Sequence, residues 1–327
     1  MEKLSDIGER KAIDIISEIV DKGSEAIGIG DDCAAFDDGE DFLLVSTDMI
    51  ADKTHVPVAM SPWQIGWYSV AVNLSDIAAK GGLPLGLVLS LGLPKNTPVN
   101  FFKQLVRGAN DCAKTYDTAI VGGDTKEQQH LTVCGTVFGR VKKNEFMSRH
   151  GMMSGEILAV TGNLGKAAAE YLAMNLKQEN KTYFKGLLEP KPRLKEGRLM
   201  AANKTITSCM DISDGLSSSL YQLAKINGLG FCINKENIPI SPILKKIANV
   251  NKNIDVFDYA INFGGDFELL FTLPKNKFKQ LQLSLKKIDC PVTAIGEVKK
   301  ETEIIQKDGD NFSKILNKGY EHFKSHF

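Results

Sequence analysis

The chain has 327 residues, of which 43% are hydrophobic, so it can form one large domain or two of ordinary size around a substantial core. Forty basic residues balance 40 acidic residues, and this even charge predicts no general affinity for nucleic acid or for a membrane surface. No apolar run approaches the roughly 18 residues that suggest a membrane span. The N-terminal stretch MEKLSDIGER also lacks the apolar core of a signal peptide.

Six cysteines are scattered along the chain, with no C-x-x-C pair and no neighbouring histidines. This spacing argues against a zinc site. It favours reduced thiols that pack as small hydrophobic residues, and we therefore expect a cytoplasmic protein.

Helical and strand-like segments alternate through the first part of the chain. Apolar periodicity predicts helices over residues 4–20, 62–80 and 98–116, and short apolar runs predict strands over 42–46, 85–93, 118–121 and 131–141. The segment GGDTKEQQ, between the last two strands, is expected to form a turn. The polar stretch KKNEFMSRH follows, and it marks the expected boundary between a first domain, residues 1–145, and a second domain, residues 146–327.

The second part of the chain shows a similar mixture. Helices are predicted over residues 166–176, 192–203, 216–227, 242–250 and 255–263, and strands over 157–161, 268–273 and 292–298. No short-period repeat or low-complexity tract is present. The expected fold class is therefore α+β, or mixed α/β, in two halves.

Two glycine-containing stretches come close to phosphate-binding motifs but fail. In GIGDDC, the fingerprint G-x-G-x-x-G lacks its last glycine, and acidic residues in that turn repel a pyrophosphate unless a metal intervenes. In TGNLGKA, Ala167 stands where a P-loop has its metal-binding Ser or Thr. If the protein uses ATP, it does so without a Walker A loop.

Aspartates recur at the predicted ends of these elements, among small and apolar residues. In IGIGDDCAAF, Asp31 and Asp32 stand side by side, and a buried carboxylate is costly unless a cation or hydrogen-bond donors compensate it. Five more aspartates share this kind of setting: Asp48, Asp76, Asp124, Asp211 and Asp214. Because a rigid scaffold can bring element ends together at one cavity, we expect these carboxylates to converge.

Several Mg²⁺ ions would explain such a group of carboxylates, because Mg²⁺ prefers oxygen ligands and neutralises charge during phosphoryl transfer. The hydroxyls of Ser46, Thr47 and Ser213 offer further ligands or phosphate contacts. Each aspartate also has a structural interpretation. These are a turn for Asp32, an i, i+4 pair with Lys80 for Asp76, a Gly-Gly turn for Asp124 and a helix cap for Asp214.

Taken together, the motifs resemble the thiamine-monophosphate kinase family. The matching stretches are GIGDDCAAF, LLVSTDMI, VNLSDIAAKGG, VGGDT, SRHGMMSGE, MDISDGL and FGGDFELLFT, in the family's order over nearly the whole chain. The resemblance implies the superfamily of aminoimidazole ribonucleotide synthetase and selenophosphate synthetase, with two α+β domains and N-terminal domains that pair in a homodimer. It also implies that ATP and thiamine monophosphate give ADP and thiamine diphosphate, with several Mg²⁺ ions.

The resemblance further implies roles for individual positions. Metal ligation, partly through water, is implied for Asp32, Ser46, Thr47, Asp48, Asp76, Asp124, Asp211 and Asp214. ATP contacts are implied for Gly122, Gly123, Asp124, Arg149 and Ser213. Substrate contacts are implied for His55, Asp266, Asn317 and Tyr320.

Three departures from the family pattern affect the substrate side. Val56 follows His55 where the family often has Phe, and GGDFELLF is one residue shorter than the common pattern, so that Glu268 is an alternative to Asp266. Asn317 stands near the place of a stacking aromatic residue. The metal site is therefore the firmer part of the prediction.

The implied reaction is a direct in-line transfer in which a phosphate oxygen of thiamine monophosphate attacks the γ-phosphorus of ATP. That oxygen is already anionic, so we expect no covalent phosphoenzyme and no strong general base. Two other interpretations remain open. One is another ATP-dependent synthetase of the superfamily, activating an amide or a selenide, and the other is a non-catalytic nucleotide-binding maturation factor.

Overall fold

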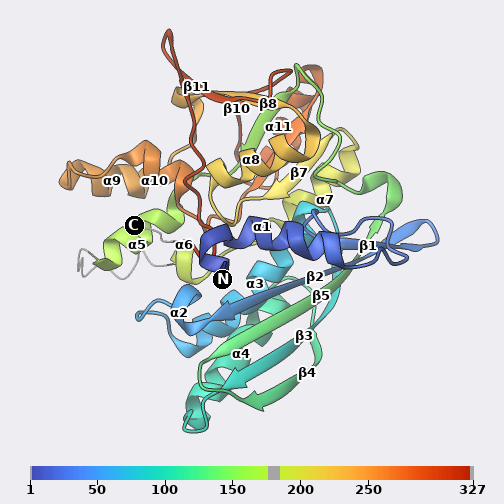
Figure 1. The fold of residues 1–327 in the computed structure, drawn as a ribbon, viewed down its shortest axis with the longest axis vertical. Coiled ribbons are helices and arrows are strands. Elements are labelled where there is room, and N and C mark those ends of the chain that lie inside the picture. The colour runs from blue at the N-terminus through green and yellow to red at the C-terminus, as the bar shows by residue number, and fades with distance from the viewer. Residues whose placement is uncertain (1, 176–184, 325–327) are drawn as a thin grey trace.

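Two β-sheets, one from each half of the sequence, form the framework of the protein (Figure 1). A computed structural model describes residues 2–175 and 185–324. The first sheet has the order β1-β2-β5-β3-β4, and its neighbours are antiparallel except for β3 and β4. Its strands are β1 (Ala34–Asp38), β2 (Asp41–Ala51), β3 (Leu83–Leu93), β4 (Ile120–Glu127) and β5 (Thr132–Lys142).

Four helices belong to the first half: α1 (Leu4–Ile19), α2 (Asp52–His55), α3 (Pro62–Ala79) and α4 (Val99–Thr115). Helix α3 begins at Pro62, behind an N-cap Ser61 whose hydroxyl accepts the Gln64 amide, and Gly81 follows its end at φ 67°. The helix is apolar on nearly all sides, because it packs against the first sheet, α4 and elements of the second half. Helix α3 thus lies at the junction of the two halves.

The second sheet has the order β12-β11-β8-β10-β6-β9-β7, with β8 and β11 as its parallel pair. Its strands are β6 (Ile157–Thr161), β7 (Ser208–Asp211), β8 (Gly230–Asn234), β9 (Leu269–Leu273), β10 (Val292–Lys299), β11 (Ile304–Asp308) and β12 (Asn311–Lys314). The accompanying helices are α5 (Lys166–Asn175), α6 (Lys185–Leu188), α7 (Leu194–Asn203), α8 (Leu216–Asn227), α9 (Pro242–Val250), α10 (Val256–Asn262) and α11 (Lys275–Lys286). Short 3₁₀ turns occur at Lys143–Glu145 and Lys235–Asn237.

Helix α1 lies against the second half of the chain, although it comes first in the sequence (Figure 1). Arg10 and Asp14 form ion pairs with Asp214 and Lys225, respectively. The predicted helix is confirmed, but its apolar residues stay largely outside the core, with Ile19 75% exposed. The domain boundary remains a prediction.

The predicted order of helices and strands is confirmed over most of the chain. One predicted turn is wrong, and several elements were not predicted. The segment GGDTKE is not a turn, because β4 continues through it and pairs in parallel with β3. At Gly123 a Cβ atom would lie 1.9 Å from the Leu89 carbonyl oxygen, so a residue without a side chain permits this close pairing. The elements that the sequence did not predict are β1, β7, β8, β11, β12, α2, α6 and α11.

Candidate active site

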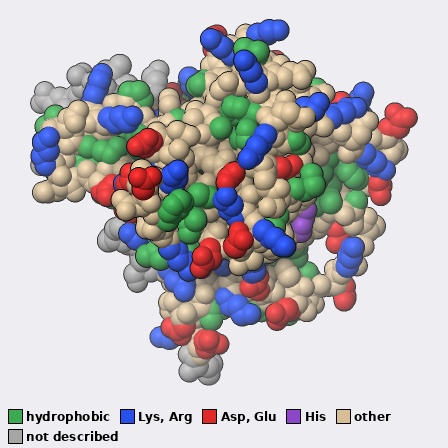
Figure 2. Space-filling model, turned by 90° about the horizontal axis from the view of Figure 1, so that it is seen from above, with side chains coloured by type: hydrophobic (Ala, Val, Ile, Leu, Met, Phe, Trp, Pro, Cys, Tyr) green, Lys and Arg blue, Asp and Glu red, His purple; other side chains and the backbone are tan. Residues whose placement is uncertain are grey.

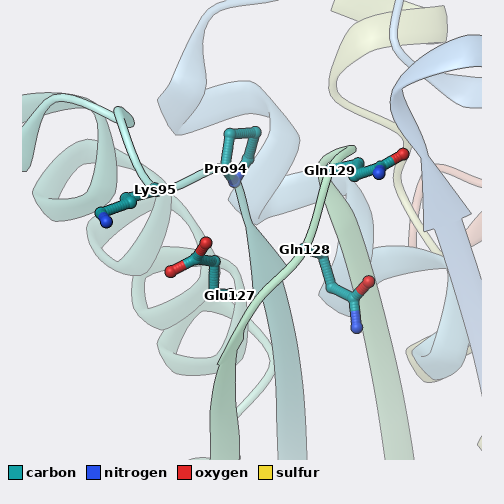
Figure 3. A pocket seen from close by; sticks show the side chains of 5 residues that line it. All are labelled: Pro94, Lys95, Glu127, Gln128 and Gln129. Atoms are coloured by element: carbon teal, nitrogen blue, oxygen red, sulfur yellow. The ribbon is translucent and has the colours of Figure 1, made fainter.

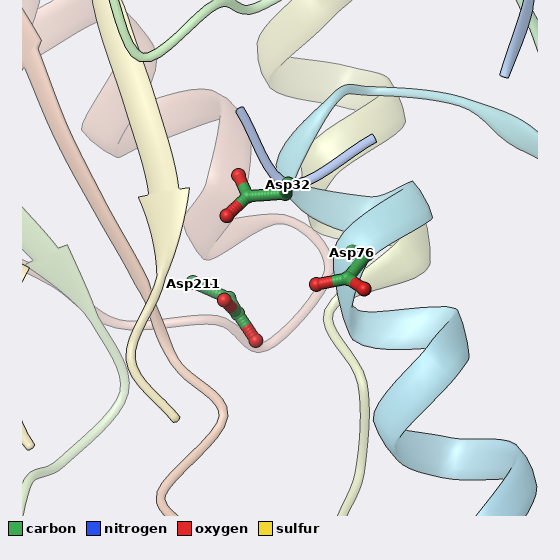
Figure 4. Close-up of side chains that lie close together, drawn as sticks. All are labelled: Asp32, Asp76 and Asp211. Atoms are coloured by element: carbon green, nitrogen blue, oxygen red, sulfur yellow. The ribbon is translucent and has the colours of Figure 1, made fainter. Parts of the chain in front are cut away.

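Three carboxylates from distant parts of the chain, two of them buried and that of Asp76 half-buried, meet at the junction of the two halves (Figure 4). Asp32 lies in the bend before β1, Asp76 lies on α3, and Asp211 ends β7. One oxygen from each carboxylate lies within 4.8 Å of the others. Such a group of hard oxygen atoms can hold a divalent cation.

Neighbouring side chains orient these carboxylates. The Ser46 hydroxyl on β2 donates to Asp76 Oδ2 at 2.5 Å, and the Ser75 hydroxyl on α3 donates to Asp211 Oδ2 at 2.6 Å. Asn73 Oδ1 accepts the backbone N–H of Asp48 at 3.2 Å, which ties β2 to α3 beside the cluster. The positions of the acidic groups are therefore set by fixed donors on two packed elements.

Burial makes the ionised state of this cluster costly. It raises the pKa of Asp211 to about 7, and the negative charge of Asp32 adds to the effect. It also raises the pKa of Asp48 to about 6, although a hydrogen bond with Asp76 opposes the shift. The pKa of Asp76 rises too, first through burial and then through Asp48 and Asp211. Added positive charge would stabilise all three ionised groups.

Two cations of the chain already face Asp32. The Arg149 guanidinium donates to Asp32 Oδ1 through Nε at 2.8 Å and also through Nη2. The Lys80 ammonium lies 2.8 Å from Asp32 Oδ2, and among the described residues that oxygen accepts no hydrogen bond. A buried carboxylate oxygen that has an ionic neighbour but accepts no hydrogen bond, beside two carboxylates of raised pKa, fits the ligand set of a Mg²⁺ ion.

The structural interpretations of Asp76 and Asp214 do not hold. Lys80 pairs with Asp31 and Asp32, not with Asp76. Asp214 does not cap α8, because the N-cap is Gly215 and makes no side-chain bond. The Asp214 carboxylate instead accepts a hydrogen bond from Arg10 Nη2 at 2.7 Å, while burial still raises its pKa.

Four predicted residues lie away from the three carboxylates. Thr47 is exposed on the face of the first sheet opposite to Ser46 and Asp48, as the alternation of a strand requires, and its hydroxyl bonds the Gly135 carbonyl at 2.8 Å. Gly122, Gly123 and Asp124 are exposed on β4, the edge strand of that sheet. With three strand spacings of about 4.8 Å between β4 and β2, Asp124 cannot share a ligand shell with Asp48 of the same chain.

The predicted substrate residues divide into two places. The His55 ring lies 5.3 Å from the ring of His322, which in turn meets Tyr320 edge-on at 4.9 Å. Burial and then His322 lower the pKa of His55 to about 4, so this imidazole is neutral near pH 7. Asn317 is exposed on the segment that leads to Tyr320.

Both acidic residues of the GGDFELL segment are buried in contacts of their own. Asp266 accepts the backbone N–H groups of Gly165 and Ala167 at 2.5 and 3.1 Å, so it caps the start of α5. Glu268 is paired with Lys166 and Arg193 at 2.5 and 2.7 Å. These contacts account for both carboxylates structurally, and a substrate role for either remains a prediction.

Sequence reasoning did not assign three residues that touch this region. Lys80 faces Asp32, Arg10 binds Asp214, and His322 lies between His55 and Tyr320. Lys80 follows an almost entirely apolar helix, and this position could have indicated a buried lysine. A buried lysine requires acidic partners, so the same signal could have pointed to the aspartates. The contacts of Arg10 with Asp214 and of His322 with His55 join segments that lie far apart in the sequence, so no local pattern predicts them.

Two features of the described surface lie outside the acidic cluster. A shallow hollow lined by Pro94, Lys95, Glu127, Gln128 and Gln129 contains none of the predicted residues (Figure 3). Basic and acidic side chains are interspersed on the face seen in Figure 2, which differs from the basic surface typical of nucleic-acid binding. Among the described residues, no helix combines the length and apolar character required to span a membrane.

The two halves match known protein domains. Residues 30–141 match the family model "AIR synthase related protein, N-terminal domain", and residues 154–307 match "AIR synthase related protein, C-terminal domain". With the acidic cluster at the junction of the halves, the fold defines an AIR synthase-related protein.

Curated relatives show which family within this class the chain resembles. The thiamine-monophosphate kinase of Methanospirillum hungatei is 37% identical over 96% of this chain and 99% of its own length, and that of Pyrococcus horikoshii is 33% identical over 90% and 91%. The solved structure "AaThiL complexed with AMPPCP and TMP" is 27% identical, has a TM-score of 0.87, and is matched over 98% of this chain and 99% of that chain. The chain belongs to the thiamine-monophosphate kinase family.

Proposed function

We propose that this protein transfers the γ-phosphate of ATP to the phosphate of thiamine monophosphate, forming thiamine diphosphate and ADP. The observation that carries the proposal is the convergence of Asp32, Asp76 and Asp211, which come from three separate motifs of the family. The relatives' shared kinase name and the similar structure with AMPPCP and TMP support it.

Asp32, Asp76 and Asp211 would hold Mg²⁺, and Asp48 lies close enough to Asp76 to share in binding. Bound Mg²⁺ supplies positive charge that offsets the repulsion between two phosphorylated substrates. Ser46 and Ser75 keep the carboxylates oriented before any ligand arrives. The acidic cluster itself repels phosphate, so metal and nucleotide are expected to bind together.

The residues around the cluster suggest where each substrate binds. Arg149, which binds Asp32, and the exposed Ser213, two residues after Asp211, are the proposed contacts for ATP phosphates. The rings of His55 and Tyr320 both contact the His322 ring, and these two residues are the proposed binding surface for thiamine monophosphate. A neutral His55 imidazole suits contact with a cationic thiazolium ring, because it adds no repelling charge.

A homodimer is part of the proposal. The face of the first sheet that carries Thr47 also exposes Met49, which is 61% exposed, and β4 leaves Asp124 open to solvent. If this face packs on the same face of a second copy, Thr47 and Asp124 can reach a shared site that one chain alone leaves divided. Sedimentation velocity on the wild type and on Met49→Asp tests this, and a monomeric wild type would contradict it.

Incubation with ATP, thiamine monophosphate and Mg²⁺, followed by chromatography of the thiamine phosphates, tests the proposed reaction. We expect thiamine diphosphate and ADP in equal amounts. ATP consumption without thiamine monophosphate would favour another synthetase of the superfamily, and nucleotide binding without turnover would favour a maturation factor. In the same assay, omission of Mg²⁺ should abolish product formation. We also place the enzyme in the cytoplasm, because all six cysteines are free.

A further inference from the structure

Lys80 is a fully buried lysine that contacts each of the elements bearing the three carboxylates. Its ammonium lies 2.5 Å from Asp31 Oδ1 and 2.8 Å from Asp32 Oδ2, in the bend before β1. It donates to the Cys209 carbonyl at 2.9 Å, two residues before Asp211 on β7. Lys80 itself follows α3, one turn after Asp76. One side chain therefore joins the bend, α3 and β7.

The charges around Lys80 are unevenly compensated. Asp31 and Asp32 face Lys80, and Asp32 also faces Arg149, so two positive groups balance two negative groups. Among the described residues, no Lys or Arg lies within ion-pair distance of Asp76 or Asp211. The Phe146 ring closes the remaining side, 5.8 Å from the ammonium. The uncompensated charge is confined to the Asp76 and Asp211 side of the cluster.

We propose that Lys80 is a permanent counter-ion that assembles the carboxylate cluster without metal and limits how much divalent cation the cluster needs. The proposal rests on the metal site of the proposed function and deepens it. Lys80 is a positioning residue, because it acts through Asp31, Asp32 and the Cys209 carbonyl. Without it, a divalent cation has to supply the missing charge.

The test compares the thermal unfolding of the wild type and of Lys80→Met, each with EDTA and with excess Mg²⁺, in the absence of nucleotide and thiamine monophosphate. Removing one partner of a buried ion pair is strongly destabilising, so Lys80→Met should unfold at a markedly lower temperature in EDTA. Mg²⁺ should then raise its Tm at least about twice as much as it raises that of the wild type. A merely structural lysine would lower the Tm equally in both buffers.

Two further variants separate charge from packing. Asp31→Asn combined with Lys80→Met removes one negative and one positive charge, so its Mg²⁺ response should return to the wild-type value. Lys225→Met, on an exposed lysine that pairs with Asp14, is the matched control and should leave the Mg²⁺ response unchanged. If Lys80→Met yields no folded protein, the double variant should still be recovered folded.

Three outcomes would overturn the proposal: an equal Mg²⁺ response in wild type and Lys80→Met, a double variant that behaves like the single variant, or a double variant that also fails to fold. A wild type without any Mg²⁺ response would remove the metal site as well. Failure of the kinase reaction alone would leave these measurements unaffected, because no substrate is present in them.

Discussion

Arg149 binds Asp32 across the junction of the two halves, with Nε 2.8 Å from Oδ1 and a second contact through Nη2. The two residues stand 117 positions apart in the sequence. Burial opposes the charge of Arg149, but the carboxylates of Asp32 and Asp31 raise the pKa of the guanidinium, which stays charged. The forked guanidinium places two donors on one carboxylate oxygen, which makes Arg149 both a link between the halves and a fixed positive group beside the proposed nucleotide site.

Arg149→Met should therefore harm both stability and catalysis. Breaking this buried pair should lower the free energy of unfolding by about 3–5 kcal/mol, and kcat/KM for ATP should fall at least about tenfold. Urea unfolding and initial rates at varied ATP measure the two effects. Arg149→Lys keeps the charge without the fork and should recover part of the stability. Wild-type ATP kinetics in Arg149→Met would contradict the assigned nucleotide contact.

Asp211→Asn should separate catalysis from folding. The amide removes a buried charge whose ionisation is unfavourable, because burial raises the pKa of Asp211 to about 7, and its oxygen can still accept from Ser75. We expect a Tm in EDTA at or above the wild-type value at pH 8, and a loss of turnover of at least about 100-fold. Scanning fluorimetry and the chromatographic assay provide the readouts. Turnover close to the wild-type value in Asp211→Asn would contradict the proposed role of Asp211 in metal binding.

His55→Ala should act on one substrate. His55 lies with His322 and Tyr320, in the group proposed to contact thiamine monophosphate, so KM for thiamine monophosphate should rise at least about fivefold while KM for ATP changes less. His55→Gln, which retains a hydrogen-bonding side chain, is the matched variant. Equal changes in both KM values would remove the proposed substrate contact.

Glu170 should make stability depend on pH away from the active site. Its buried carboxylate accepts the backbone N–H groups of Gly186 and Leu187, and burial, only partly offset by these bonds and Lys166, raises its pKa to about 7. Between its ordinary value of 4.5 and about 7, the folded state binds the proton more tightly than the unfolded state. Stability should thus fall with rising pH in this window, by up to about 1.4 kcal/mol per pH unit from this group.

Glu170→Gln removes this titration and should make the fall in stability between pH 5 and pH 7 less steep, as measured by urea unfolding in buffers that contain EDTA. The Asp211→Asn variant, compared over the same range, reports the contribution of Asp211, and the slope that remains comes from the other buried carboxyl groups. An unchanged slope in Glu170→Gln would show that this carboxyl titrates normally.

Local patterns predicted much of the fold and the main acidic residues. Asp32, Asp76 and Asp211 each stand in a short motif beside apolar residues, and these three do converge. The alternation of β2 places Thr47 on the opposite face from Asp48, although resemblance grouped them in one ligand set. Periodicity assigns a residue to a face, but it does not say whether a second copy covers that face.

Local sequence patterns did not predict the contacts between segments that are distant in the chain. Glycines at 122 and 123 suggested a turn, whereas β3 provides a parallel partner that keeps β4 extended. Helix α11 has few apolar residues and was not predicted, but Leu281 and Leu285 anchor it in the core. The partners of Lys80 lie 49 and 129 positions away, and only the packing of the two halves brings them together.

The three converging carboxylates are made at different times during translation. Asp32 and Asp76 leave the ribosome long before Asp211, which ends a strand of the second sheet. A nascent first half therefore carries an incomplete set of the three carboxylates. The three carboxylates can come together only after translation has passed β7, when Lys80 also gains its last partner, the Cys209 carbonyl.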